Sequence, residues 1–147
     1  MGLNWPDNNH NYVPAYQMSG IPFVTGSVST TELTTTPIKV KFPYVTRWIQ
    51  IRNTGNQTLR VGFTENGVNA NNTGAYHITA SNRNYIGLMA HGSSILSNLG
   101  PIEVKCTEVW LRSDSGTTGY ELTAGYTAIP AHQFLTLTGS ENFQGVG

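Results

Sequence analysis

The chain has 147 residues, of which 11% are charged, against roughly 25% in typical globular domains. Eight Lys and Arg residues balance eight Asp and Glu residues, so the formal net charge is zero. This composition argues against nucleic acid as the main partner, because phosphate binding needs a clustered excess of Lys and Arg. A nearly neutral surface also gives little electrostatic repulsion, which favours association with other molecules.

Residues 1–20 predict an extended arm ahead of one folded domain, which we place at residues 21–147. The arm is rich in Asn, Pro and aromatic residues and has almost no aliphatic periodicity. Two interpretations stay open, a flexible terminus and an arm that docks on a neighbouring molecule. Trp5, Tyr12 and Tyr16 are the candidate interface residues of the second interpretation.

The first half of the domain predicts four strands. Residues 21–28 form a short apolar run, placed at a sheet edge because Pro22 cannot donate to a ladder. Apolar and polar residues then alternate over 38–42, 45–52 and 59–64, the period-2 pattern of strands with one buried face. The segment Asn53–Asn56 favours a turn with positive φ, so we expect 45–52 and 59–64 to form a β-hairpin. The strand at 38–42 would then join them in one antiparallel sheet.

The second half predicts a long loop at 66–84, of the kind that is functional or exposed at an assembly surface, followed by further short strands. We expect these strands at 85–90, 93–96, 102–111, 120–126 and 134–137, with turns at 98–101 and 113–119. Within 102–111 the apolar phase switches, which predicts a β-bulge near Thr107 or Glu108. No segment predicts a helix.

About eight short strands at this spacing indicate an all-β protein, an antiparallel β-sandwich whose leading form is a single eight-stranded jelly roll. The predicted core residues all lie on the apolar phases of these strands. They are Ile49, Ile51, Leu59, Val61, Phe63, Val104, Leu111 and Leu122.

The sequence carries no signature of catalysis, of a metal or of a cofactor. His91 stands near Ser93, but no nucleophile motif surrounds the pair, which favours a turn over a catalytic dyad. Cys106, the only cysteine, lies on the apolar phase, which predicts a buried structural thiol and no disulfide or Cys-based zinc site. The four histidines follow no metal-ligand spacing, and Asp114 favours an Asx-type turn over a calcium site. We therefore expect a protein that is not an enzyme and has no cofactor.

Trp48 and Trp110 fall on the polar phases of their strands and are further candidate interface residues. They can pack against a neighbouring subunit, stack on a sugar, or face a second layer of the core.

Two N-x-T sequons, at Asn56 and Asn71, would matter only in a glycosylating pathway. The N-terminus lacks the features of a signal peptide, and no apolar run approaches the roughly 20 residues that span a bilayer. We therefore expect a soluble protein made in a reducing compartment, without membrane insertion.

Several stretches resemble the small single jelly-roll proteins of icosahedral virions. They are RNTGNQTLRVGFTENGV (52–68), EVWLRSDSGTTGYELTAGYTAI (108–129) and the Asn/Pro/Tyr-rich arm, together with the low charge. The vertex (penton) proteins of large DNA viruses are the closest comparison. The similarity covers residues 38–130 and lies in the general character of the sequence and in the strand order; no diagnostic motif supports it.

The resemblance implies a structural subunit located in the virion capsid and made in the host-cell cytoplasm. Such a subunit would form a homo-oligomer, a pentameric ring, in contact with major and minor capsid proteins. It implies no catalytic residues. Two other functions remain open: a glycan-binding module, since jelly rolls also serve as lectins, and a capsid decoration or fibre-type protein. The oligomeric mass separates the three, because they predict a pentamer, a monomer and a trimer respectively.

Overall fold

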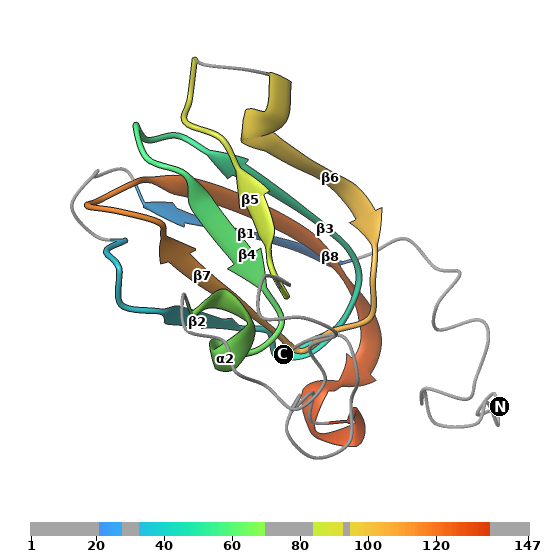
Figure 1. The fold of residues 1–147 in the computed structure, drawn as a ribbon. Coiled ribbons are helices and arrows are strands. Elements are labelled where there is room, and N and C mark those ends of the chain that lie inside the picture. The colour runs from blue at the N-terminus through green and yellow to red at the C-terminus, as the bar shows by residue number, and fades with distance from the viewer. Residues whose placement is uncertain (1–20, 28–32, 70–83, 93–94, 136–147) are drawn as a thin grey trace, which may run out of the picture.

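The computed structural model describes residues 21–27, 33–69, 84–92 and 95–135 (Figure 1). Within these residues the fold is built of strands, with one single-turn helix and two short 3-10 turns. The strands are β1 (Ile21–Ser27), β2 (Ile38–Lys41), β3 (Tyr44–Asn53), β4 (Leu59–Gly62), β5 (Ile86–Leu88), β6 (Asn98–Glu103), β7 (Glu108–Ser113) and β8 (Tyr120–Pro130). The helix is α2 (Glu65–Val68), and the 3-10 turns are η1 (Ile95–Ser97) and η2 (Ala131–Gln133).

The strands form two four-stranded antiparallel sheets that pack face to face as a β-sandwich (Figure 1). One sheet has the order β1-β8-β3-β6 and the other β2-β7-β4-β5. The pairing is nested along the chain. The first strand pairs with the last, β1 with β8, and the same pattern continues inward with β2 and β7, β3 and β6, and β4 and β5. The expected all-β sandwich is confirmed, as is the edge position of β1.

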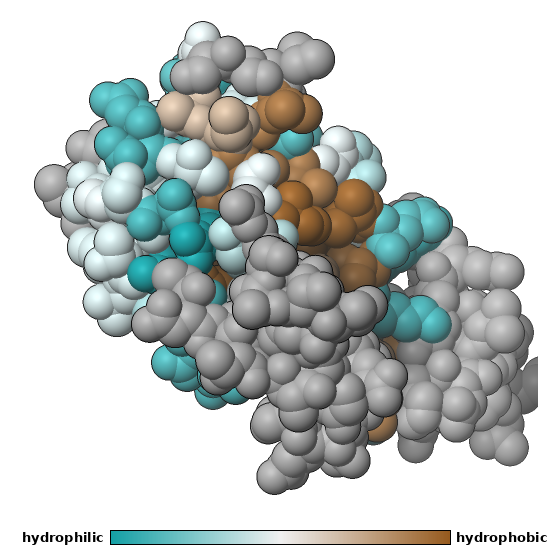
Figure 2. All heavy atoms as spheres, viewed as in Figure 1, coloured by the Kyte–Doolittle hydropathy of each residue, from teal (hydrophilic) through white to brown (hydrophobic). Residues whose placement is uncertain are grey.

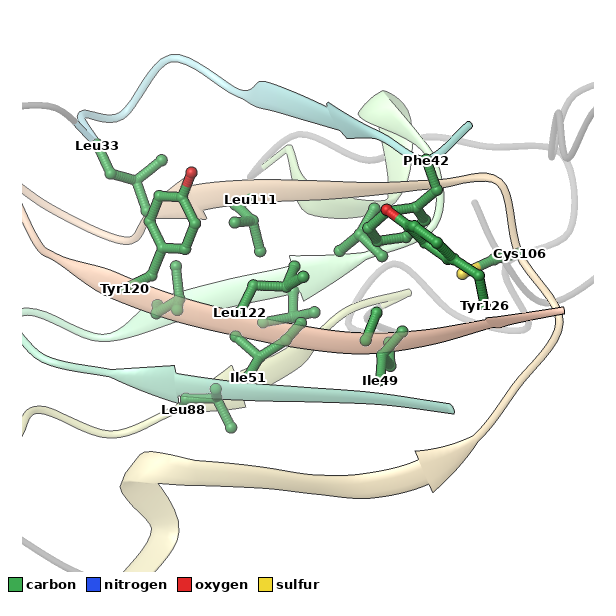
Figure 3. Packing of buried hydrophobic residues seen from close by; sticks show 14 residues of the cluster. Leu33, Phe42, Ile49, Ile51, Leu88, Cys106, Leu111, Tyr120, Leu122 and Tyr126 are labelled. Carbon is green, nitrogen blue, oxygen red and sulfur yellow. The ribbon is translucent and has the colours of Figure 1, made fainter. Parts of the chain in front are cut away.

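The core lies between the two sheets (Figure 3). Ile49 and Ile51 of β3 and Leu122 of β8 point into it from the first sheet, and Leu111 of β7 meets them from the second. Full burial of each such side chain contributes roughly 1.5–3 kcal/mol. Six of the eight predicted core residues are buried, and the other two, Phe63 and Val104, are partly buried and pack against the same cluster. The predicted strand phases are therefore correct.

The predicted hairpin between 45–52 and 59–64 is wrong. β3 pairs with β6 and β8, whereas β4 pairs with β5 and β7, so the two strands belong to opposite sheets. The prediction that the strand at 38–42 joins these two in one sheet is also wrong, because β2 lies in the sheet of β4 and not in that of β3. Strands that face each other across a core show the same alternation as strands that lie side by side, because both bury one face.

The buried side chain of Asn53 holds the crossing from β3 to β4. Its Nδ2 lies 2.7 Å from the carbonyl oxygen of Gln57, 3.0 Å from that of Leu88 and 2.9 Å from that of Met89. Its Oδ1 accepts from the backbone N–H of Gly55 (3.0 Å) and from the hydroxyl of Thr118 (2.8 Å). No residue of 53–56 has a positive φ. Gly55 is needed for space instead, since a Cβ there would collide with Thr118.

The bulge predicted near Thr107 or Glu108 is not a bulge within one strand. At this place the chain crosses from one sheet to the other, as it does between β3 and β4. β6 belongs to the first sheet and β7 to the second, and residues 104–107 connect them. The phase of the apolar residues switches because the chain changes sheet. Thr46 holds this crossing: its Oγ1 donates to the carbonyl of Val104 (2.7 Å) and accepts from the N–H of Cys106 (3.0 Å). The turn expected at 98–101 is also wrong, because these residues lie within β6.

Three further differences lie at the ends of elements. The expected strand 59–64 stops at Gly62 because Thr64 caps α2, accepting from the N–H of Gly67 at 3.0 Å. The prediction that no segment forms a helix was therefore wrong. The expected strand 93–96 contains η1 instead, with residues 93 and 94 outside the described part, and the expected strand 85–90 shortens to β5. Residues 134 and 135 follow η2 without strand structure, and residues 1–20, 70–83 and 136–147 lie outside the described part.

Candidate interaction site

The structure separates the two tryptophans of the predicted interface. Trp48 of β3 precedes the buried Ile49, and Trp110 of β7 precedes the buried Leu111, so each indole lies on the outer face of its own sheet. The two outer faces lie on opposite sides of the sandwich, so the two residues do not share a site. Trp5, Tyr12 and Tyr16 lie outside the described residues.

Both tryptophans are half-buried by their own chain. The indole of Trp48 covers Gly125 of the neighbouring β8, where an added Cβ would collide with it. The ammonium group of Lys39 lies 4.9 Å from the ring centroid of Trp110, and the Nε1–H of Trp110 donates to Oε1 of Glu108 at 3.1 Å. One face of the Trp110 ring and its only donor are therefore already engaged, which leaves less of this residue for stacking on a sugar.

A cluster of side chains around the buried Arg60 lies on the same outer face as Trp110, and the sequence did not predict it. The guanidinium of Arg60 donates to the carboxylate of Asp114, with Nε at 2.7 Å, and lies 4.5 Å from the ring centroid of Tyr85. Arg60 and its cross-strand neighbour Arg112 both reach the carbonyl oxygen of Val68, at 3.3 and 3.4 Å. The cluster therefore fastens α2 to the sheet, and Arg112 also donates to the carbonyl oxygen of Thr35 at 2.6 Å.

Asp114 thus binds Arg60 through its carboxylate, where the sequence predicted an Asx-type turn. Period-2 alternation predicts that the Arg60 side chain points outward, and an outward side chain is expected to be exposed to solvent. The residue is instead buried, because α2 packs over β4 and β7 there. The signals in the sequence from which α2 could be predicted are Asn66-Gly67, which favours a turn, and Thr64, a residue type suited to capping a helix.

The buried ionisable groups serve the fold. Burial raises the pKa of the Cys106 thiol to about 11, and its Sγ lies 3.3 Å from Oγ1 of Thr46. The predicted buried structural thiol is confirmed, and a thiol with so high a pKa is a poor nucleophile at neutral pH. Burial likewise raises the pKa of Tyr126 to about 12, and its hydroxyl has no hydrogen-bond partner among the described residues.

The remaining candidates for chemistry form no shared site among the described residues. His91 is exposed and its backbone N–H donates to the carbonyl of Gly55 at 2.8 Å, while Ser93 lies outside the described residues. In the part of the chain that the structure describes, no three His, Cys, Asp or Glu side chains gather as a metal site would require. Of the two sequons, Asn56 is exposed on the crossing between β3 and β4, and Asn71 lies outside the described part.

Exposed apolar side chains lie instead at the two side edges of the sandwich, and at one of these edges they form a group. Figure 2 shows one group over β5, η1 and β6, where Met89 and Leu96 are 45% and 61% exposed. We call this surface the β5–β6 edge; its exposed apolar residues are Ile86, Met89 and Leu96, beside Leu99 and Ile102, which are partly buried against the core. On the opposite side, the β1 edge carries Ile21 and Val24, which are 52% and 73% exposed and lie on opposite faces of the strand. Single exposed apolar residues are ordinary on a protein surface, but a group of them at one place marks an interaction site.

The described residues contain no helix of the length and apolarity needed to cross a membrane. No family model matches the chain, and comparisons with characterised proteins and with solved structures gave no match either. The fold and the two edges are therefore the observations on which a function can be argued.

Proposed function

We propose that the chain is a non-enzymatic structural subunit that associates with copies of itself, and that it forms the vertex (penton) of an icosahedral virion. In this proposal five copies form a ring that contacts major and minor capsid proteins. The observation that carries it is the exposure of apolar side chains on both side edges of a nearly uncharged sandwich. Such edges are typical of surfaces that become buried on association.

The strand order supports a jelly roll as the finer description of the sandwich. A jelly roll consists of eight strands in two Greek keys. It results when a long antiparallel hairpin, in which the first strand pairs with the last and the second with the seventh, is rolled up into two sheets. The pairs β1·β8, β2·β7, β3·β6 and β4·β5 and the orders β1-β8-β3-β6 and β2-β7-β4-β5 follow that scheme.

The polar groups of the sandwich favour a structural role over a catalytic one. The thiol of Cys106 faces the core, and the Arg60–Asp114 pair holds α2. The engagement of Trp110 by Lys39 and Glu108 weighs against a glycan-binding module, which needs an open aromatic face.

The first experiment measures the mass of the full-length protein by sedimentation and native mass spectrometry. We expect a pentamer. A trimer would favour a decoration or fibre-type protein, and a monomer that binds an array of glycans would favour the lectin-like module.

The second experiment removes the arm. We expect a protein lacking residues 1–20 to remain a folded β-domain but to be lost from particles, because Trp5, Tyr12 and Tyr16 offer aromatic area suited to anchoring an interface. Incorporation of the truncated protein at normal occupancy would show that the arm is only a tail.

A further inference from the structure

We propose that Asn66 is a modification site whose spontaneous deamidation is controlled by α2. The sequence contains a single Asn-Gly pair, Asn66-Gly67. Such a pair deamidates faster than other pairs that begin with Asn, because glycine has no side chain to hinder attack by its own nitrogen. The structure places this pair inside α2, where Asn66 is exposed and Gly67 is buried.

The reaction needs no reagent other than water. The backbone nitrogen of Gly67 loses its proton to a base and attacks Cγ of Asn66. A C–N bond forms, and the side-chain nitrogen of Asn66 leaves as ammonia with a proton taken from water. Water then opens the cyclic imide at one of its two carbonyl groups. The products are aspartate and isoaspartate, and in isoaspartate the main chain runs through Cβ and is one methylene longer.

The turn holds both polar groups of the peptide unit that has to react. The N–H of Gly67 donates to Oγ1 of Thr64 at 3.0 Å, and the carbonyl oxygen of Asn66 accepts from the N–H of Asn69 at 3.3 Å. Thr64 is itself buried, so a base in solution has little access to the proton of Gly67. The ring can close only when the Gly67 nitrogen eclipses Cβ of Asn66, which a helical ψ of about −42° does not allow.

Contacts with the sheet keep α2 closed. The carbonyl oxygen of Val68 accepts from Arg60 and Arg112, at 3.3 and 3.4 Å, and the Val68 side chain is fully buried. Gly62 of β4 leaves room for this side chain, since a Cβ there would lie 2.7 Å from Cγ1 of Val68. Deamidation therefore requires α2 to open locally, and the rate of deamidation measures how often it opens.

The modification in turn removes α2. Isoaspartate in place of Asn66 lengthens the main chain within a helix of one turn, so the hydrogen bonds of Gly67 and Asn69 no longer fit. The carbonyl oxygen of Val68 then moves away from the buried Arg60, which loses an acceptor. The change accumulates with the age of the protein, because neither product returns to asparagine.

The test follows deamidation of the full-length protein in mildly alkaline buffer. Peptide mass spectrometry measures the rate, with fragmentation that localises the change to Asn66 and distinguishes isoaspartate from aspartate. We expect the folded protein to deamidate at least about tenfold more slowly than the same chain in urea, because only the open turn reacts. Equal rates in the folded and unfolded states would overturn the control by α2.

Variants of the cap and of the sheet contact test how α2 is held closed. T64A removes the acceptor of the Gly67 N–H, whereas T64S retains a hydroxyl and is the matched control. We expect T64A to deamidate about fivefold faster than the wild type, the change in local opening that loss of an N-cap bond produces, and T64S to keep the wild-type rate.

R112A removes one donor to the Val68 carbonyl at a partly exposed position, so it is expected to fold even if T64A does not. It should accelerate the reaction in the same direction, and thermal melting verifies that each variant is folded. Wild-type rates in T64A and R112A would overturn the proposal.

N66D tests the consequence for α2, because it carries the charge of the product without the added methylene. Aged wild-type protein, freed of unmodified chains by ion exchange, should melt at a lower temperature than N66D. Equal melting temperatures would overturn the loss of α2 on modification.

Discussion

Replacement of Asn53 by alanine tests whether the crossing from β3 to β4 is held by one buried side chain. The amide engages three carbonyl oxygens, one backbone N–H and the hydroxyl of Thr118. Gln57 and Thr118 retain their contact with each other at 3.2 Å, so three groups lose the partner that Asn53 provides, the carbonyls of Leu88 and Met89 and the N–H of Gly55. A buried polar group left unpaired costs about 1–3 kcal/mol, less where water enters the space.

We therefore expect Asn53→Ala to lower the free energy of unfolding by about 3–5 kcal/mol, from a total of roughly 5–15 kcal/mol for a domain. The melting temperature should fall by about 10 °C. Urea denaturation followed by tryptophan fluorescence measures the difference, and Asn56→Ala, at an exposed position of the same crossing, is the control with an expected loss below about 0.5 kcal/mol. A loss below about 1 kcal/mol for Asn53→Ala would refute the reasoning, because the crossing would then be held by something other than this side chain.

Three further predictions concern the core. Val61→Ala and Leu111→Ala should each cost about 2–4 kcal/mol in urea denaturation, from lost transfer energy and a new cavity, and losses below about half a kcal/mol at both would contradict the core. Tyr126→Phe removes a buried hydroxyl without a described partner, so the melting temperature should stay equal or rise; a loss above about 1 kcal/mol would show that the hydroxyl is bonded. The pKa of Cys106 rises from 9.0 to about 11 and that of Tyr126 from 10.0 to about 12, so the folded state binds more protons than the unfolded state at high pH. These groups should not change the free energy of unfolding with pH below pH 9, and the free energy should fall as the pH rises from 9 to 12. In Cys106→Ala the fall between pH 9 and 11 should be shallower, because one of the two groups is removed. A free energy of unfolding that is independent of pH over this range would contradict the prediction.

The sequence predicted which side of each central strand is buried, but not which strands are neighbours. Alternation over 45–52 and 59–62 reports only that one face of each strand is apolar, and both sheets bury such a face. Asn53 contained the missing information. It continues the inward phase of Ile49 and Ile51, and a fully buried amide needs several partners, which the backbone of a loop between two sheets supplies.

The candidate site was less predictable than the core. Alternation does not distinguish a central strand from an edge strand, so it gives no reason for Val24 and Ile86 to be exposed. The burial of Arg60 depends on α2, a single turn that starts at Thr64 and is too short to show periodicity in the sequence. The sequence correctly predicted outward positions for Trp48 and Trp110, the two candidate interface tryptophans, yet their half-burial comes from contacts with Gly125 and Lys39, which lie far away in the chain.

The pairing of the first strand with the last has a consequence for how the chain reaches its native state. Ile21 lies opposite Tyr126, about a hundred residues later in the sequence, so this contact closes a very long loop. β3, at the centre of the same sheet, has both of its neighbours, β6 and β8, in the second half of the chain. During synthesis the amino-terminal strands must therefore wait, with their apolar faces uncovered, until β8 leaves the ribosome. Folding rates fall as contacts become less local, so we expect this domain to fold in milliseconds to seconds rather than microseconds. A chain that ends before Tyr120 would leave β1 without a neighbour and β3 open along one side, and such a fragment should aggregate rather than fold.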